Sequence, residues 1–328
     1  MFKKRFLSLC VALLMLLSLS ACQTDEGTSS AASPSNADTA AKPVKDRAGN
    51  DITVPDTVEK IIVLAPSSAQ VICELGLTDK IIACDTQTPS YTTGLKEGIP
   101  QFDLMQPDME KLLSLKPDIV FASGLSSLGG ADTFKPLRDA GICVADIPSS
   151  NSIADVKKDV EFVADCVGKS AEGKKLTADM QTDIDEIAAI GKTIADKKSV
   201  LFEIASAPNI FSFGKGVFLH EMIELIGATN VLSDQESWIA VTEEAAVSAN
   251  PDVILTNVNY EPDPVGDIKK LKGWKNVTAV KNNAVYYIDN GASSLPNHHI
   301  VDALRQMAKA VYPDQYKDID SPLDNASK

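Results

Sequence analysis

One pattern occurs twice in this chain, at residues 110–121, EKLLSLKPDIVF, and at residues 244–255, EAAVSANPDVIL. Each copy begins as a helix and breaks at Pro-Asp, because proline cannot continue a helix. Each then ends in an apolar run typical of a central strand in a parallel sheet. The repeat predicts an α/β protein with two lobes of similar plan and a ligand cleft between them. The alternative is that such units recur in any α/β protein.

The N-terminus indicates export. Lys3, Lys4 and Arg5 precede an apolar run over residues 6–19, which ends in Leu-Ser-Ala-Cys at Cys22. The run is short for a membrane span, and a small residue followed by cysteine is a lipoprotein cleavage site. We expect residues 1–21 to be a signal peptide and Cys22 to carry diacylglycerol with chains such as palmitate. An ordinary signal or anchor with an incidental cysteine is the alternative.

The composition after the signal favours a tethered protein on the outer face of the cell membrane. Residues 22–43 contain no large apolar run and are predicted to form a flexible tether. The net charge of the chain is −14, and removal of the basic signal makes it more negative. We therefore do not expect nucleic acid as a partner. The negative surface suits either docking onto a positively charged partner or simple solubility.

The rest of the chain is long enough for two lobes of ordinary domain size. We expect an N-terminal lobe over 44–151, a connecting helical segment over 152–197, a C-terminal lobe over 198–316 and a tail over 317–328. The connecting segment has apolar residues at helical spacing, with a break near residues 168–170. Buried strands are predicted at 61–64, 80–84, 118–122, 141–145, 199–204, around Ile254 and at 285–288, with a loop at 205–216 and a final helix at 300–311.

The hydroxyl groups after the first strand have two interpretations. Ser67 and Ser68 stand just before a helical pattern, where serine commonly caps the first turn. Loops at the carboxyl ends of parallel strands are also where open α/β sheets bind ligands, so Ser67 is a candidate ligand contact.

The chain lacks the usual signatures of an enzyme. Gly124 begins a GLSSLG segment without the glycine placement of a nucleophile elbow, and Ser212 begins SFGKG, which is no phosphate loop. Three histidines without metal-ligand spacing argue against a bare-metal carrier, and no cofactor is expected. An extracellular hydrolase or a structural lipoprotein remains the alternative outside this class. Cys73, Cys84, Cys143 and Cys166 suit either disulfides or buried thiols.

The chain contains, in order, the lipobox, KIIVLAPSSAQVICELGL from Lys60, MEKLLSLKPDIVF from Met109, SFGKGVFLHEMIELIGATNV from Ser212, WKNVTAVKNNAVYYID from Trp274 and IVDALRQMAKAVYP from Ile300. Together these segments resemble the periplasmic-binding family for iron chelates, haem and cobalamin, the substrate-binding lipoproteins of ABC importers. The resemblance covers residues 44–316. It implies two Rossmann-like lobes joined by a single long helix, with a ligand held between them. It further implies that Glu110 and Glu244 dock into arginine pockets of a permease dimer.

The resemblance leaves the ligand open. Trp238 matches a pocket tryptophan of cobalamin binders, and Met105 matches an axial methionine of haem receptors, although Asn259 stands where those receptors have a histidine. Tyr260 could bind ferric iron, or it could be a packing residue. His298 could face the cleft, or it could be an exposed loop residue.

The sequence thus predicts a monomeric, non-enzymatic receptor that captures a ferric siderophore and delivers it to an ABC permease. Haem or cobalamin binding by the same fold is the alternative. The candidate ligand contacts, chosen on loops at strand ends, are Ser67, Met105, Gly124, Phe211, Phe213, Trp238, Tyr260 and His298.

Overall fold

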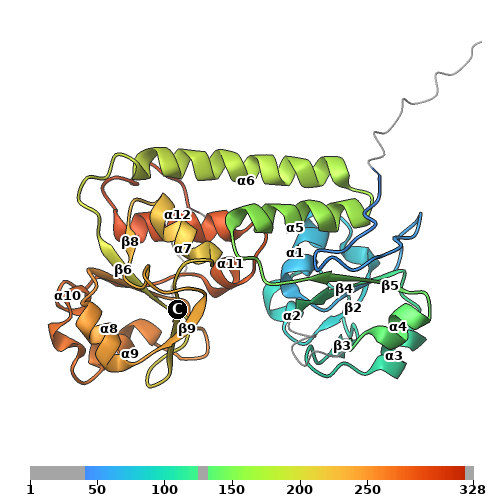
Figure 1. The fold of residues 1–328 in the computed structure, drawn as a ribbon, viewed down its shortest axis with the longest axis horizontal. Helices are drawn as coiled ribbons and strands as arrows, with labels where there is room; N and C mark the ends of the chain where they lie inside the picture. The colour runs from blue at the N-terminus through green and yellow to red at the C-terminus, as the bar shows by residue number, and fades with distance from the viewer. Residues whose placement is uncertain (1–40, 125–131, 322–328) are drawn as a thin grey trace, which may run out of the picture. The chain divides into compact units, whose positions relative to one another are not determined.

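The computed structural model describes residues 41–124 and 132–321, and its N-terminal lobe is built on a five-stranded sheet (Figure 1). The strands lie in the order β3-β2-β1-β4-β5, and every pair is parallel. Their bounds are β1 Ile61–Val63, β2 Ile81–Asp85, β3 Gln101–Phe102, β4 Ile119–Ser123 and β5 Cys143–Ile147. The helices of this lobe are α1 Pro66–Glu74, η1 Thr78–Lys80, α2 Thr88–Tyr91, α3 Met109–Ser114 and α4 Lys135–Asp139.

The C-terminal lobe repeats this plan with a parallel sheet in the order β11-β10-β6-β8. Its strands are β6 Ser199–Glu203, β8 Thr229–Asn230, β10 Val253–Thr256 and β11 Val285–Tyr287. Its helices are α7 Phe218–Leu225, α8 Glu243–Ala249, α9 Pro264–Lys270, η3 Trp274–Asn276, α10 Thr278–Lys281, α11 Asn290–Ser294 and α12 Ile300–Val311. The predicted two-lobed α/β fold is confirmed.

The core explains why these apolar runs form strands. Ile61 and Val63 of β1 pack into one apolar cluster of the N-terminal lobe, and Ile62 between them packs into another on the opposite face. Phe202 and Leu201 of β6 divide in the same way between two clusters of the C-terminal lobe. Strands covered by helices on both faces need apolar residues at every position, which is the pattern in the sequence.

The repeated motif has the same structure in both lobes. Lys116 after α3 and Asn250 after α8 both have a positive φ, in the left-handed region of the backbone. Each stands directly before the proline of its copy. The carboxylate of Asp118 then accepts hydrogen bonds of 2.8 Å from the backbone of Glu59 and Lys60, just before β1. In the second copy, the carboxylate of Asp252 accepts from the backbone and the hydroxyl group of Ser199, also at 2.8 Å. The aspartate therefore fixes the start of the neighbouring strand in each lobe.

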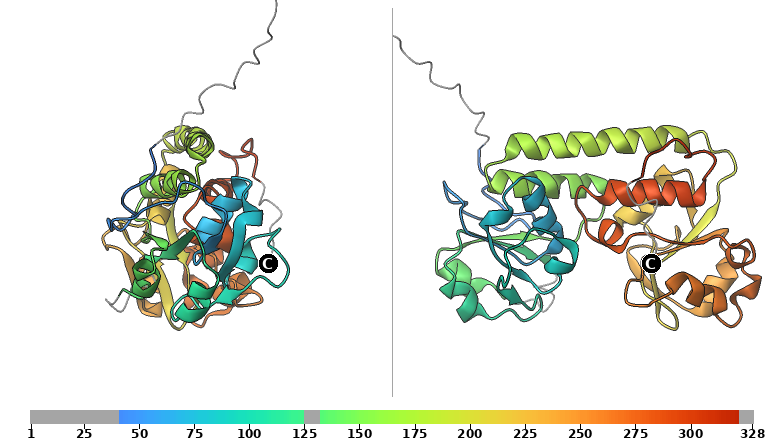
Figure 2. Two further views of the ribbon diagram at one scale, coloured as in Figure 1. Left: turned by 90° about the vertical axis from the view of Figure 1, so that its right-hand side faces the viewer. Right: turned by 180° about the vertical axis from the view of Figure 1, so that it is seen from behind.

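Two helices connect the lobes. α5, Ile153–Cys166, packs along α6, Ser170–Gly191, and the chain turns between them at Gly168, whose φ is 73°. The close packing needs a glycine at residue 173, because a Cβ there would lie 2.4 Å from Cβ of Ala164. The 22-residue α6 is the long helix, and it runs beside α5 and then beside α12 (Figures 1 and 2). The predicted break near residues 168–170 is confirmed, while the boundaries between lobes stay a prediction.

Two local expectations were wrong. The predicted loop over residues 205–216 contains a strand, β7, Ile210–Phe213, which pairs antiparallel with β9, Trp238–Val241. Helix α1 is not capped by a serine, because Pro66 occupies its first position and Ala65 becomes the N-cap without a side-chain hydrogen bond.

Cys73, Cys84 and Cys143 of the N-terminal lobe and Cys166 of α5 are free thiols, and burial raises the pKa of Cys84 and Cys143 to about 11. The signal peptide, Cys22 and most of the predicted tether lie outside the described residues, as does the end of the predicted tail. Among the described residues, no helix has the length and apolar character needed to cross a membrane.

Candidate functional site

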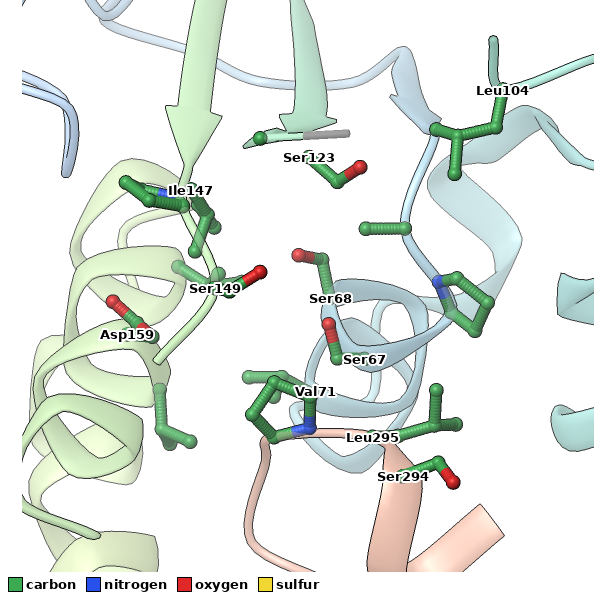
Figure 3. A pocket seen from close by; sticks show the side chains of 17 residues that line it. Ser67, Ser68, Val71, Leu104, Ser123, Ile147, Ser149, Asp159, Ser294 and Leu295 are labelled. Atoms are coloured by element: carbon green, nitrogen blue, oxygen red, sulfur yellow. The ribbon is translucent and has the colours of Figure 1, made fainter. Parts of the chain in front are cut away.

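A pocket of about 190 Å³ lies at the carboxyl ends of β1, β4 and β5 (Figure 3). We call it the serine pocket, because Ser67, Ser68, Ser123, Ser149 and Ser294 all contribute to its lining. Its other lining residues are Ala65, Pro66, Val71, Leu104, Gly124, Ile147, Pro148, Asp159, Val160, Val163, Leu295 and Pro296. Residues 294–296 come from the C-terminal lobe, so both lobes form the pocket. The carboxyl ends of parallel strands are where open α/β sheets bind ligands.

The serine pocket includes two of the predicted ligand contacts, Ser67 and Gly124. It also includes serines that the prediction missed. Ser68 and Ser123 lie on either side of the cavity in Figure 3, on α1 and at the end of β4. The same strand-end rule that selected Ser67 and Gly124 also applies to Ser123 and Ser149, which end or follow β4 and β5.

The one carboxylate that lines the serine pocket is engaged elsewhere. Asp159 of α5 forms an ion pair with Arg47 through one oxygen, and its other oxygen accepts a 2.7 Å hydrogen bond from the hydroxyl group of Ser150. Burial raises the pKa of Asp159, while the Arg47 guanidinium opposes this shift. Because Arg47 pairs with Asp159, the α5 side of the serine pocket carries no uncompensated negative charge.

The C-terminal lobe exposes an aromatic surface beside its sheet. Phe211 and Trp238 are exposed at 37% and 38%, whereas Phe213 is fully buried. Phe213 packs edge-on against Trp238 at 5.8 Å between ring centroids and supports it from below. Phe211 and Phe213 lie on one face of the β7-β9 pair, because side chains two residues apart share a face. Of these three predicted contacts, Phe211 and Trp238 are accessible, and Phe213 is buried and packs against Trp238.

Tyr260 and Met105 are also accessible. The Tyr260 ring is 61% exposed, and its hydroxyl group is held by the backbone N–H of Ser206 at 3.0 Å and by the Ser206 hydroxyl group at 3.1 Å. Met105 is 52% exposed and follows Leu104, a residue of the serine pocket. Single exposed apolar side chains are common on protein surfaces, so exposure makes these two residues available to a ligand without marking a binding surface.

His298 lies apart from these residues. Its ring packs at 4.1 Å against the ring of His299, and its Nε2 atom is 3.9 Å from the carboxylate of Glu74 at the end of α1. Neither ring nitrogen has a hydrogen-bond partner among the described residues. Burial lowers the pKa of His298 to about 4, so the ring is neutral at physiological pH. The structure thus gives His298 a place between helices rather than on the pocket wall.

A second, more polar pocket of about 460 Å³ lies where the lobes meet. Tyr91 from α2 lines it together with Asn259, Tyr287, Asn290 and His299 from the C-terminal lobe. Nδ2 of Asn259 donates to the Tyr91 hydroxyl group at 3.2 Å, and that hydroxyl group donates to Asn290 at 2.8 Å. The sequence reasoning missed Tyr91, although its helix α2 comes directly after the carboxyl end of β2, where open α/β sheets bind ligands.

Glu203 is a buried acid at the carboxyl end of β6. Its side chain is fully buried, lines a pocket of about 150 Å³ beside α9, and has no hydrogen-bond partner within the described residues. Burial raises the pKa of Glu203 to about 8, so the group is largely protonated at neutral pH.

Glu110 and Glu244 occupy equivalent positions. Each is the second residue of its helix, after the N-caps Asp108 and Thr242, whose side chains accept from the backbone of Lys111 and Ala245. Both glutamates are exposed, and neither forms an ion pair within residues 41–124 and 132–321. No group of three or more His, Cys, Asp or Glu side chains in those ranges is placed to hold a metal ion.

Comparison with known proteins gives a consistent result. Residues 61–292 match the family described as "Periplasmic binding protein". The chain is 32% identical over 277 residues to YvrC of Bacillus subtilis, an uncharacterized ABC transporter substrate-binding lipoprotein, covering 84% of this chain and 87% of YvrC. It is 27% identical over 282 residues to a cobalamin-binding protein of Halobacterium salinarum, covering 81% and 73% of the two chains.

The fold is also similar to solved structures. A Staphylococcus epidermidis protein described as a possible iron-binding, periplasmic solute-binding protein superposes with a TM-score of 0.69. Its sequence is 26% identical, and the match covers 78% of this chain and 100% of that one.

Proposed function

The chain belongs to the periplasmic binding protein family, and from this premise we propose that it captures a ferric siderophore outside the cytoplasmic membrane and delivers it to an ABC permease. It is a substrate-binding protein of an ABC transporter of the type that handles iron, haem, cobalamin or molybdate. It is not an enzyme, because this family consists of solute-binding proteins.

One observation carries the choice of a chelate. Five large apolar side chains are exposed within the described residues, and four of them, Met105, Phe211, Trp238 and Tyr260, are also ligand contacts predicted from the sequence. Met105 follows Leu104 of the serine pocket, and Tyr260 stands between Asn259 and Glu261, which line two other pockets. Scattered aromatic and thioether groups combined with hydroxyl donors suit a bulky organic ligand with a polar metal centre.

Haem or cobalamin is the second candidate. Trp238, supported by Phe213, presents an aromatic surface against which a planar macrocycle could pack. The relative in Halobacterium salinarum is named a cobalamin-binding protein, which supports this alternative. The exposed aromatic area is small, with two tryptophans in the chain and one of them fully buried, so we favour a siderophore, which binds through scattered aromatic and polar contacts and needs no flat aromatic wall.

We further propose that Cys22 anchors the protein to the outer face of the membrane, and that Glu110 and Glu244 dock it onto the permease. The names of relatives as substrate-binding lipoproteins support the anchor. The equivalent placement of the two exposed, unpaired carboxylates supports the docking role, since one charged contact per lobe fixes the orientation of both.

Tryptophan fluorescence tests the ligand. The full chain in detergent micelles is titrated with ferric hydroxamate, ferric catecholate, haem and cobalamin. We expect saturable quenching by a ferric siderophore at micromolar or lower concentration, and loss of most of this signal in Trp238→Phe, because Trp274 is buried. The metal-free siderophore is the control ligand. Tighter binding of haem or cobalamin would make that compound the proposed ligand in place of the siderophore. If neither the ferric hydroxamate nor the ferric catecholate binds, the proposal is contradicted.

A further inference from the structure

We propose that the serine pocket binds an oxyanion group of the ligand: a carboxylate, a phosphate or a tetrahedral oxometalate. This inference rests on the proposed function, because it assigns part of the ligand's chemistry to the same receptor. It rests on three features of the pocket, namely free backbone donors, hydroxyl groups without partners, and a neutral wall.

The backbone donors come from the nine-residue helix α1. The first N–H groups of a helix have no partner within the helix and normally bond to a capping side chain. Here Pro66 has no N–H group, and Ala65 cannot cap. The N–H groups of Ser67 and Ser68 therefore point out of the helix end without a protein acceptor in the described structure, and the helix dipole favours negative charge there.

The hydroxyl groups are an independent observation. Ser68 is only 3% exposed, and its hydroxyl group forms no hydrogen bond to the described residues. The Oγ atom of Ser123 is buried and has no partner there either. Figure 3 shows the oxygens of Ser67, Ser68 and Ser149 directed into the cavity. Buried hydroxyl groups are costly to leave unsatisfied, so their convergence indicates an acceptor that they bind.

The charge of the wall permits an anion. Asp159 is paired with Arg47 and bonded to Ser150, so its negative charge is compensated. Lys and Arg side chains do not line the serine pocket in the part of the chain that is described. Recognition would therefore come from neutral donors and a helix end, and it should depend only weakly on salt.

The size of the pocket limits what enters it. A cavity of about 190 Å³ is smaller than the roughly 300–1,000 Å³ of pockets that enclose a whole organic ligand, and it has room for a tetrahedral or planar oxyanion. A whole ferric chelate does not fit. The pocket would thus hold either a free oxyanion or one acidic group of a chelate whose bulk lies outside the pocket.

Isothermal titration calorimetry on the full chain in detergent distinguishes these sources. The probes are molybdate, phosphate, citrate, ferric citrate and an uncharged ferric hydroxamate. The variants are Ser68→Ala and Ser123→Ala. The matched control is Ser212→Ala, which removes an equally buried and unpartnered hydroxyl group on the other lobe. Circular dichroism checks that each variant is folded. If Ser123→Ala is unfolded, the test rests on Ser68→Ala, which we expect to fold because alanine is favourable in a helix.

We expect at least one oxyanion probe to bind, with its Kd raised about tenfold or more by Ser68→Ala or Ser123→Ala and unchanged by Ser212→Ala. Binding of molybdate or phosphate identifies a free oxyanion. Binding of only citrate or ferric citrate identifies the carboxylate of a chelate. If no oxyanion binds, or if both variants bind as wild type does, the inference is wrong. Binding of the uncharged hydroxamate in that case would leave the proposed function standing.

Discussion

The hydroxyl group of Tyr91 in α2 donates a 2.8 Å hydrogen bond to Oδ1 of Asn290 in α11, and so joins the N-terminal lobe to the C-terminal lobe. The same hydroxyl group accepts a bond from Asn259 at 3.2 Å. The Tyr91 ring also lies close to Gly291, where an added Cβ would come within 3.2 Å of it. The link thus places a polar contact between the lobes and fixes a tyrosine at the rim of the polar pocket.

Tyr91→Phe should lower the free energy of unfolding by about 1–2 kcal/mol, because it removes both cross-lobe hydrogen bonds while keeping the ring. Urea denaturation measures the change. Tyr286→Phe is the control, since the hydroxyl group of Tyr286 has no hydrogen bond in the described ranges. Equal stability of Tyr91→Phe and wild type would show that the link contributes nothing.

Glu203 should make the protein less stable as pH rises. In the folded protein the Glu203 carboxyl group has a pKa of about 8, so it keeps its proton up to about that pH. In the unfolded chain it loses the proton near the ordinary glutamate pKa of 4.5. Stability should therefore be full below about pH 4.5 and fall through pH 8, by roughly 5 kcal/mol at most. Glu203→Gln should remove this slope, measured by urea unfolding across that range. Glu186→Gln, at an exposed glutamate, should keep it. A wild-type slope in Glu203→Gln would contradict the assignment.

His298 should act in the opposite direction. Its pKa is about 4 in the folded protein, below the ordinary histidine pKa of 6.5, so the unfolded chain binds the extra proton first as pH falls. The resulting stability is present above about pH 6.5 and is lost as pH falls to 4, by roughly 3 kcal/mol. The groups that face it are Glu74, His299 and Asp302. His298→Gln should flatten the acid side of the profile, and an unchanged acid side would rule out this origin.

Charge reversal tests the docking surface. The double variant Glu110→Lys, Glu244→Lys should keep the ligand affinity of wild type and lose stimulation of the permease's ATP hydrolysis, because both lobes then present the wrong charge. Glu97→Lys, Glu186→Lys changes the net charge equally at two other exposed glutamates that form no ion pair in the described residues. If both double variants behave alike, the effect is one of net charge and not of docking.

The central strands and the last helix could be predicted from the sequence because their signals are local. Buried parallel strands are continuous apolar runs, and the helix predicted at 300–311 is α12. The strands β7 and β9 were missed because Phe213 pairs with Trp238 across a segment that contains α7 and β8, a contact that no local pattern contains.

The candidate site was predicted only in part, because some of its features have local signals in the sequence and others depend on tertiary contacts. Strand-end loops are recognisable, which led to Ser67 and Gly124 in the serine pocket. Whether a side chain on such a loop is exposed depends on tertiary packing, which buries His298 against α1 and Phe213 beneath Trp238. The unpartnered hydroxyl groups of Ser68 and Ser123 likewise follow from Pro66 at the first position of α1 and from the meeting of distant loops.

Uptake of a radiolabelled ferric siderophore by cells that lack this chain tests the central claim most directly. We predict that uptake is lost on deletion, that it returns with the wild-type chain, and that it does not return with Glu110→Lys, Glu244→Lys despite normal binding by that variant. Undiminished uptake of every ferric siderophore in the deletion strain would contradict the proposal that this receptor delivers ferric siderophores to an ABC permease.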